Sequence, residues 1–571
     1  MHQQNDVRIY LIFFVFVAFA FVLVGRLFFL QTIEADKYRT LADDQYVRPA
    51  PDRSDRGNIF FTYKTGETIS AATLGYGYEV IVDPSMIADA DAVVSALKNI
   101  FPTLDTDDTI VRLADKHSKY VVVIERIDEE TADTVNALDI DGVGAYRQNW
   151  RVYPGETLAA HVLGFVGYDG NGFSGRYGLE RYYEDILSRN DTYVPANFFV
   201  ELFSNITDSI LYAGKERAGD IVSSVEPNIQ AYAERVLRET RAHWASDEGG
   251  MIVVDPMTGR VYAMAAFPSF DPNVYGKETN TAVFVNPLTE NVYEMGSIIK
   301  PLTVAAGLDA GVITAKTTYN DTGSIVLNGA KISNYDGKAR GVVPMQEVLN
   351  QSLNTGVSFI VSKLGHEQFR TYMRKLGIDE ETGIDLPGEV HGLADNLDSP
   401  RDIEYATASF GQGIAMTPIE ATMALSALGN GGKLLTPGLV TRIAYEDGSE
   451  KLIYPDEGRQ VFKKSTSDEI TRMLVTVVDD ALAGGKYALP QHTIAAKTGT
   501  AQMSNPAGGG YYEDRYLHSF FGYFPAYNPR FLVFMYHTYP KGAKYASETL
   551  TAPFMEMTKF LISYYEIPPD R

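Results

Sequence analysis

Ser297-Ile298-Ile299-Lys300, followed directly by Pro301, is the most informative stretch of the chain. Residues three apart are neighbours on a helix face, so Lys300 can lie over the Ser297 hydroxyl. Proline is tolerated only near the start of a helix, which places Ser297 in the first turn with its own N–H free. Lysine can activate a serine when burial or a neighbouring cation removes its proton. Such quartets also arise by chance on surface helices, so this one needs support from elsewhere.

Two further short motifs follow in chain order. Ser352-Leu353-Asn354 offers a hydroxyl that can relay a proton and an amide that can bind a substrate peptide. Lys497-Thr498-Gly499-Thr500 predicts a strand with a cation and two hydroxyls for a substrate carboxylate, and a glycine where substrate backbone can approach. The N–H groups of Ser297 and Thr500 can form an oxyanion hole. Each motif alone is better explained as a capped helix or the end of a strand. Their occurrence together in this order favours a shared functional site.

Composition excludes several other classes of protein. The formal net charge of -23 argues against nucleic-acid binding, because neutralising phosphates takes an excess of Lys and Arg. The chain has no cysteine, which removes thiol nucleophiles, disulfides and thiolate metal sites. Its nine histidines are scattered, and we find no phosphate-binding glycine loop. We therefore expect no metal site and no cofactor.

The apolar run Ile9–Leu30 predicts a membrane anchor. As a helix it would be about 33 Å long, enough to span a bilayer, with Arg26 near one end. A cleaved signal peptide is the alternative, but cleavage after Ala18-Phe19-Ala20 would fall inside the run. The flanking charges do not support an inside amino terminus. No second span follows, so everything downstream is expected on one side of the membrane.

The pattern of apolar and polar residues changes near residue 220. Residues 31–220 mix short β-type runs with turn-rich stretches and hold no catalytic constellation. Beyond that point we expect strands at Gly250–Val254, Val261–Ala265, Phe520–Phe524 and Phe531–His537, and helical stretches around 300–310, 345–365 and 415–429. Strands, then helices, then strands predict an α+β architecture with an antiparallel sheet flanked by helices.

Together the three motifs form the ordered signature of penicillin-binding proteins and serine β-lactamases. The chain resembles class B penicillin-binding proteins along nearly all of its length, in strings that include Arg56-Gly57-Asn58-Ile59, Arg151-Val152-Tyr153-Pro154, Gly178-Leu179-Glu180, Phe410-Gly411-Gln412-Gly413 and Ile567-Pro568-Pro569-Asp570. The resemblance implies a short cytoplasmic tail (1–8), a transmembrane anchor (9–30), a non-catalytic pedestal domain of the dimerisation type (31–220) and an extracytoplasmic transpeptidase domain (221–571).

The resemblance also implies the reaction. Ser297 would attack the D-Ala–D-Ala bond of a peptidoglycan stem peptide while Lys300 takes its proton. Ser352 and Lys497 would pass a proton to the departing D-alanine, and Asn354 would orient the peptide. Lys497, Thr498 and Thr500 would hold the terminal carboxylate, with Gly499 between them. An amine of a second stem peptide would then take the acyl group, and β-lactams would block Ser297 covalently.

Several alternatives stay open at this point. The motifs would also serve an elongation-type transpeptidase or a D,D-carboxypeptidase, and a catalytically silent scaffold or wall sensor is the non-enzymatic alternative. Thr382–Glu389 and the compact carboxyl end look closer to division-type members, which favours septal cell-wall synthesis. No segment resembles a glycosyltransferase domain, so we expect a membrane glycosyltransferase and division-complex proteins as partners.

Overall fold

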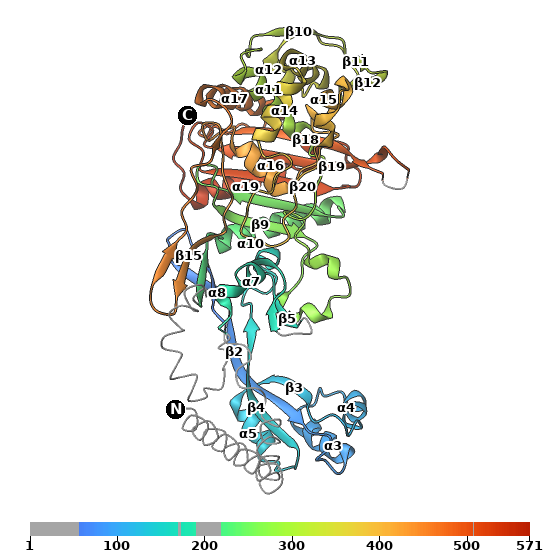
Figure 1. The fold of residues 1–571 in the computed structure, drawn as a ribbon, viewed down its shortest axis with the longest axis vertical. Coiled ribbons are helices and arrows are strands. Elements are labelled where there is room, and N and C mark those ends of the chain that lie inside the picture. The colour runs from blue at the N-terminus through green and yellow to red at the C-terminus, as the bar shows by residue number, and fades with distance from the viewer. Residues whose placement is uncertain (1–55, 169–172, 190–217, 506–507) are drawn as a thin grey trace, which may run out of the picture. The chain divides into compact units, whose positions relative to one another are not determined.

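The computed structural model describes residues 56–168, 173–189, 218–505 and 508–571 (Figure 1). Within these ranges no helix is both long enough and apolar enough to cross a membrane. The predicted tail (1–8) and the predicted anchor (9–30) lie outside the described residues.

Packing divides the chain into two compact units. The smaller unit contains Leu74–Trp150, and the larger one joins Arg56–Thr73 to Arg151–Arg571. The domain boundary expected at residue 220 stays a prediction, because it rests on a change in sequence texture. By packing, the described residues on both sides of that position belong to the larger unit.

The smaller unit combines three strands with three short helices. Strand β3 pairs antiparallel with the second half of β2, and β4 pairs with β2 as well. Each helix begins at an aspartate whose carboxylate accepts a backbone N–H of the first turn. Its elements are β2 (Thr68–Val82) from Leu74 onward, α3 (Ala90–Ile100), α4 (Thr106–Leu113), β3 (Val121–Ile127), α5 (Glu129–Asn136) and β4 (Val143–Val152) as far as Trp150.

The centre of the larger unit is a five-stranded antiparallel sheet in the order β18-β19-β20-β8-β9. The four strands expected from the sequence lie inside β8, β9, β19 and β20, so these predictions are confirmed. Strand β18 carries the Lys497 motif at the edge of the sheet. The strands are β8 (Gly249–Val254), β9 (Val261–Phe267), β18 (Ala495–Ser504), β19 (Tyr511–Phe524) and β20 (Phe531–Thr538).

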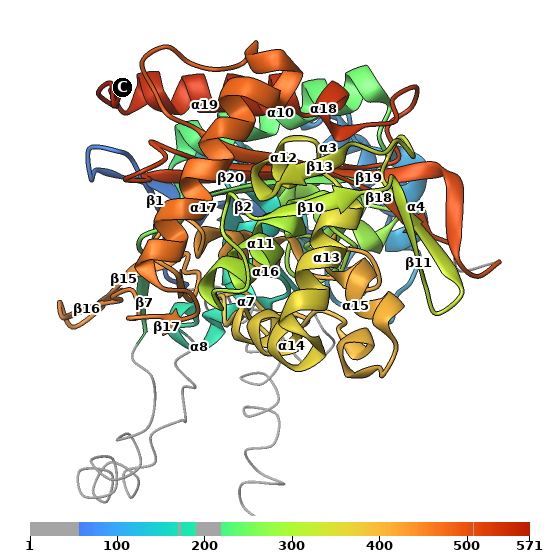
Figure 2. The same cartoon turned by 90° about the horizontal axis from the view of Figure 1, so that it is seen from above.

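Helices cover both faces of this sheet, as alternate residues of β8 show. Met251 and Val253 pack in a core with α10 and α19, whereas Ile252 and Val254 pack in another core with α11 and α16. Figure 2 shows these two helical layers on either side of the sheet. The α+β prediction is therefore confirmed. The helices are α10 (Pro227–Trp244), α11 (Lys300–Asp309), α16 (Pro418–Ser426), α17 (Lys464–Thr476) and α19 (Thr551–Tyr564).

The helical structure expected around 345–365 is present as two helices. Helix α12 (Met345–Asn350) ends before Ser352, and α13 (Asn354–Leu364) begins after it. Ser352 has a φ of 53°, in the left-handed region that a right-handed helix cannot contain. The same lobe contains α14 (His366–Lys375), α15 (Asp402–Ala408) and the pairs β10 (Thr318–Asp321) with β13 (Gly341–Pro344) and β11 (Ser324–Leu327) with β12 (Ala330–Ser333).

A second sheet in the larger unit joins distant parts of the chain. Strand β1 (Ile59–Thr62) pairs antiparallel with the first half of β2 and parallel with β7 (Gly219–Ser223). On its other side β7 pairs with β15 (Val440–Tyr445). Shorter elements of the larger unit are β5 (Val166–Tyr168), β6 (Phe173–Gly175), β14 (Lys433–Leu434), β16 (Glu450–Leu452), β17 (Arg459–Gln460), α6 (Ala160–Leu163), α7 (Gly178–Tyr182), α8 (Glu184–Leu187) and α18 (Ala546–Thr549).

Three of the strings that carry the family resemblance meet in one buried ion cluster near β1. The Glu180 carboxylate on α7 accepts hydrogen bonds from Arg56 Nε and Arg151 Nε, each at 2.6 Å. Tyr153 also donates to it, at 3.2 Å. Burial alone would raise the pKa of Glu180, but Arg151 and Arg56 hold it below the usual value. These strings therefore hold the larger unit together, whereas the reaction chemistry lies elsewhere.

Candidate active site

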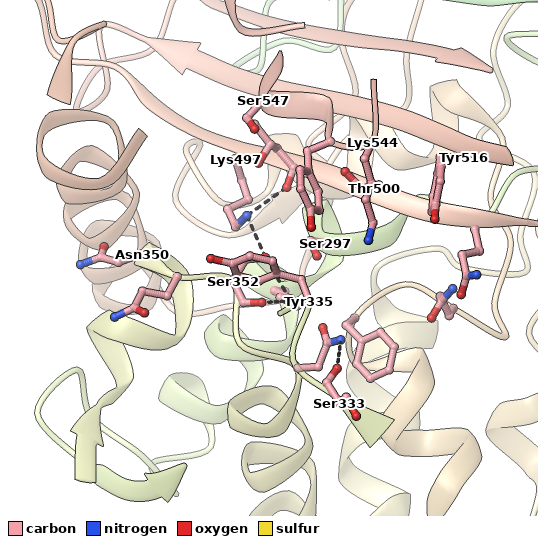
Figure 3. Close-up of a pocket in the computed structure, with 18 of the residues that line it drawn as sticks. Ser297, Ser333, Tyr335, Asn350, Ser352, Lys497, Thr500, Tyr516, Lys544 and Ser547 are labelled. Carbon is pink, nitrogen blue, oxygen red and sulfur yellow. Dashed lines mark hydrogen bonds between the residues drawn. The ribbon is translucent and has the colours of Figure 1, made fainter. Parts of the chain in front are cut away.

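A cleft of about 890 Å³ lies among β18, the start of α11, the break between α12 and α13, and the loop after β20. Figure 3 shows residues from these elements pointing into it. The lining includes every predicted site residue except Gly499, namely Ser297, Lys300, Ser352, Asn354, Lys497, Thr498 and Thr500. Three motifs that are up to 200 residues apart in the chain therefore share one cavity.

Ser297 stands on a single 3-10 turn, Gly296–Ile299, that runs directly into α11. Pro301 is at the start of that helix, where its missing N–H costs nothing, as the sequence predicts. Gly296 has a φ of 65°, and a Cβ added there would lie 2.8 Å from the carbonyl carbon of Thr500. Only glycine allows this turn to lie so close to β18. The backbone beside Ser297 consequently faces the backbone of Thr500, as a two-part oxyanion hole requires.

Gly411 supports the turn from the other side. Its carbonyl accepts the N–H of Gly296 at 3.1 Å, and a Cβ on Gly411 would lie 2.3 Å from the Gly296 carbonyl oxygen. The next residue, Gln412, lines the cleft. In the sequence, Phe410–Gly413 carries part of the family resemblance but indicates no role. Its glycines, both at positive φ, were the signal that a close backbone approach was needed.

Lys300 is buried, with 1% of its surface exposed. Its ammonium donates to the Ser352 carbonyl at 2.5 Å and to the Ser352 hydroxyl at 3.0 Å. Burial lowers the pKa of Lys300 well below its usual value, and the neighbouring Lys497 lowers it further. A neutral lysine beside Ser297 has a free lone pair, so it can accept the serine proton.

Lys497 reaches the same hydroxyl from β18. Its ammonium donates to Ser352 Oγ at 3.2 Å and to the Thr498 carbonyl at 3.0 Å. Burial lowers the pKa of Lys497 to about 8. Repulsion between the two ammonium groups favours the neutral form of Lys300. The pair can therefore consist of one neutral amine and one cation, joined through Ser352.

Asn354 begins α13 and donates from Nδ2 to the Ser333 carbonyl at 2.8 Å. Ser333 ends strand β12, so the amide fastens the β11–β12 hairpin to the cleft. Its side-chain oxygen stays available to accept a hydrogen bond from a substrate N–H. The sequence predicts the residue but not this second partner.

Thr500 and Gly499 point to opposite faces of β18. The Thr500 hydroxyl accepts the N–H of Ala546 at 3.0 Å, so its own proton is free to be donated to a carboxylate in the cleft. A Cβ on Gly499 would lie 2.3 Å from Ser519 Oγ and 2.7 Å from the Met295 carbonyl oxygen. Gly499 thus lets the turn that carries Ser297 pack against β18, and its predicted contact with substrate backbone stays a prediction.

The cleft also contains residues that sequence reasoning missed. Tyr335 follows β12 and Tyr545 precedes α18, and their rings meet edge to face with centroids 5.9 Å apart. Lys544 lines the cleft beside Thr500 (Figure 3). No local pattern marks these residues, because they come from loops whose places depend on the fold. In the described part of the chain, no group of three or more His, Cys, Asp or Glu side chains could hold a metal ion.

Comparisons with known proteins agree with this geometry. The family described as "Penicillin binding protein transpeptidase domain" matches residues 249–557, and "Penicillin-binding Protein dimerisation domain" matches residues 51–193. Stage V sporulation protein D of Bacillus subtilis is 28% identical over 93% of this chain and 81% of its own length. The peptidoglycan D,D-transpeptidase FtsI of Escherichia coli is 27% identical over 97% of this chain and 91% of its own.

A solved structure carries the same fold. Penicillin binding protein 3 of Mycobacterium tuberculosis, crystallised with aztreonam, is 27% identical, with a TM-score of 0.65 over 74% of this chain and 92% of that one. The transpeptidase match alone covers more than half of the present chain. With its two domain matches and its cleft of Ser297, Lys300 and Lys497, the chain belongs to the penicillin-binding protein transpeptidase family, as a class B member.

Proposed function

We propose that this transpeptidase cross-links peptidoglycan stem peptides through an acyl-enzyme on Ser297. The observation that carries the proposal is the meeting of Lys300 and Lys497 at the Ser352 hydroxyl, beside Ser297. One buried amine can act as the base while the other retains a proton for the leaving group.

In the first half of the reaction, neutral Lys300 takes the Ser297 proton as the serine oxygen attacks the D-Ala–D-Ala carbonyl. The N–H groups of Ser297 and Thr500 stabilise the oxyanion. Lys497 gives a proton through Ser352 to the departing D-alanine amine, and the peptide C–N bond breaks. Thr498 and Thr500 hold the terminal carboxylate, together with Lys497.

In the second half, the amine of another stem peptide attacks the ester on Ser297. It forms the new peptide bond, and its proton returns through the same lysines to the serine oxygen. Asn354 orients the donor peptide through its side-chain oxygen, while its Nδ2 stays on Ser333. No cofactor takes part in this scheme.

The acyl-enzyme is tested with penicillin and mass spectrometry. Penicillin-treated protein should carry the adduct on the peptide that contains Ser297, and Ser297→Ala should carry none. An adduct on any other peptide, or none on the wild type, would refute the assignment. The second outcome would favour a catalytically silent scaffold or wall sensor.

The acceptor distinguishes a transpeptidase from a D,D-carboxypeptidase. With a donor thioester and a D-amino acid amine, a transpeptidase forms the amide in preference to the hydrolysed acid. The dimerisation-domain match, which carboxypeptidase activity does not need, favours the transpeptidase. If hydrolysis dominates even at high amine concentration, the carboxypeptidase becomes the better assignment.

We also propose that the chain acts in septal wall synthesis, with a membrane glycosyltransferase and division-complex proteins as partners. The support is its likeness to division-type members in Thr382–Glu389, and its similarity to the transpeptidase FtsI. A fluorescent fusion should concentrate at the septum of dividing cells. Labelling spread along the side wall would indicate an elongation role instead.

The proposed location is the cytoplasmic membrane, with residues 9–30 as a single span and the catalytic domain outside. The support is the apolar run itself and the exposure of peptidoglycan outside the membrane. Protease added to spheroplasts should digest the chain beyond about residue 31. Complete protection would show that the orientation is reversed.

A further inference from the structure

Two buried histidines lie in line with Thr500 on the same face of the sheet. His518 on β19 stands opposite Thr500 on β18, and His537 on β20 stands opposite His518. Both histidines are fully buried, and neither is part of the reaction proposed above. They share the face of the sheet on which α18 packs, because Thr549 of that helix contacts both rings.

Their hydrogen bonds form a chain with only one possible direction. His518 Nε2 lies 3.1 Å from the Lys544 carbonyl, which can only accept, so this nitrogen carries the proton and Nδ1 does not. His518 Nδ1 therefore accepts from the Thr549 hydroxyl at 2.8 Å. Because that proton is used, His537 Nε2 must donate to Thr549 at 2.9 Å. His537 Nδ1 then accepts from Ser246 at 2.6 Å.

Both rings are neutral in this arrangement. Burial lowers the pKa of His518 to about 4 and that of His537 to about 3, and the neighbouring His518 ring lowers the pKa of His537 further. Glu548 is the charged group that opposes this effect at His518, and its carboxylate is bound to the N–H groups of Lys544 and Tyr545. The direction of the chain is consequently fixed at neutral pH.

The chain of hydrogen bonds ends on the segment Lys544–Ala546, which is part of the active site. The Ala546 N–H binds the Thr500 hydroxyl, and the side chains of Lys544 and Tyr545 line the cleft. Lys544 brings a cation to the wall beside Thr500 (Figure 3). A shift of this segment would turn the Thr500 proton away from the cleft and would move the Lys544 ammonium with it.

We propose that His518 is a positioning residue for substrate carboxylate binding, which it controls by holding Lys544–Ala546 against Thr500. The proposal rests on the acyl-enzyme function given above and adds to it a second wall of the carboxylate site. The bond that does this is His518 Nε2–H to the Lys544 carbonyl. The bond from Thr549 to His518 Nδ1 only completes the ring's polar contacts.

Two substitutions separate these bonds. His518→Gln places an amide N–H near the position of Nε2, so it can still donate to Lys544, and Thr549 can turn to its other acceptor, the Ala546 carbonyl at 3.5 Å. His518→Asn places its amide near Nδ1, so it can accept from Thr549 but does not reach Lys544. His161→Gln is the matched control, because His161 is also buried and donates to a single carbonyl, that of Val283.

The probes are benzylpenicillin, whose free carboxylate should occupy the site, and its methyl ester, which has none. Stopped-flow competition against a fluorescent penicillin separates the dissociation constant Ks from the acylation rate constant, with the full chain in detergent. In His518→Asn, Ks for benzylpenicillin should rise about tenfold, the effect of one lost charged hydrogen bond. His518→Gln should restore Ks to within about threefold. Ks for the methyl ester should change by less than about twofold in every variant.

A merely structural histidine would give a different result. Equal losses in His518→Asn and His518→Gln, or equal losses for acid and ester, would overturn the proposal. Melting temperatures should fall by similar amounts in the two variants, so stability cannot produce the difference between them. If the wild type is not acylated at all, the acyl-enzyme function fails first and this inference fails with it. If the wild type is acylated and the variants match it, the inference alone is wrong.

Discussion

Removing the charge of Lys497 should move the pH dependence of acylation. Lys300 Nζ and Lys497 Nζ lie 3.0 and 3.2 Å from the same Ser352 oxygen, so they are at most about 6 Å apart. At an effective dielectric constant of about 20, two unit charges at that distance repel by about 2.8 kcal/mol. This repulsion favours the neutral form of Lys300. Without it, Lys300 keeps its proton to higher pH.

The variant is Lys497→Met, which keeps length and burial but has no charge. Because one pH unit corresponds to about 1.36 kcal/mol, the acid limb of the acylation profile should move up by about two pH units. The assay is the second-order rate constant for a fluorescent penicillin between pH 5 and 10. The plateau of the rate constant at high pH should fall as well, because Lys497 protonates the leaving group. Only the midpoint of the acid limb reports on the pKa of Lys300.

Lys497→Arg is the matched control, because it retains the cation and should leave the midpoint near its wild-type position. In Lys300→Arg the base is replaced by a group that does not deprotonate, so acylation should fall by about 10²- to 10⁴-fold at every pH. The reasoning is wrong if Lys497→Met leaves the midpoint in place or lowers it. It is also wrong if Lys300→Arg acylates as fast as the wild type.

Three further outcomes follow from the described contacts. Glu180→Gln leaves Arg56 and Arg151 buried without their shared carboxylate. The free energy of unfolding, measured by denaturant titration, should fall by about 3–5 kcal/mol, and a loss below about 1 kcal/mol would show that the cluster is dispensable. Gly296→Ala adds a Cβ 2.8 Å from the carbonyl carbon of Thr500, at a φ of 65°. The acylation rate should fall by at least about tenfold, while circular dichroism shows that the protein remains folded. An unchanged acylation rate would contradict the close approach. Burial lowers the pKa of His161 and His518 to about 4 each, so the folded chain binds fewer protons than the unfolded chain below pH 6.5. The melting temperature should therefore fall as pH drops from 6.5 towards 4. A melting temperature that stays constant over that range would mean that these rings are not buried in the neutral form.

The sequence predicted which residues meet in the cleft better than it predicted how the cleft is built. Ser297 and Lys300 are neighbours on one turn, and Pro301 marks the start of a helix, so local rules placed them correctly. The expected strands were recognised because their apolar runs are long, and their alternate faces fill two cores.

What could not be predicted depends on segments that meet only in the folded chain. Local periodicity predicted helical structure around 345–365, but it did not show that the break between α12 and α13 lets Ser352 reach both lysines. The sequence predicted that Gly499 admits substrate backbone, but it did not indicate that Ser519 and Met295 pack against the side where a Cβ would lie. His518 and Lys544 carry no motif at all. Their roles come from strand register and from a loop that follows a different strand.

The pairing of β1 with β7 has a practical consequence for cutting the protein into fragments. A fragment that began at residue 221, where the sequence pattern changes, would lack β1 and the whole ion cluster of Arg56, Arg151 and Glu180. It would begin inside β7 with an unpaired edge, which invites association with other chains. A soluble version for crystallisation or inhibitor screening should therefore retain the chain from Arg56 onward, even though everything that reacts lies after residue 290.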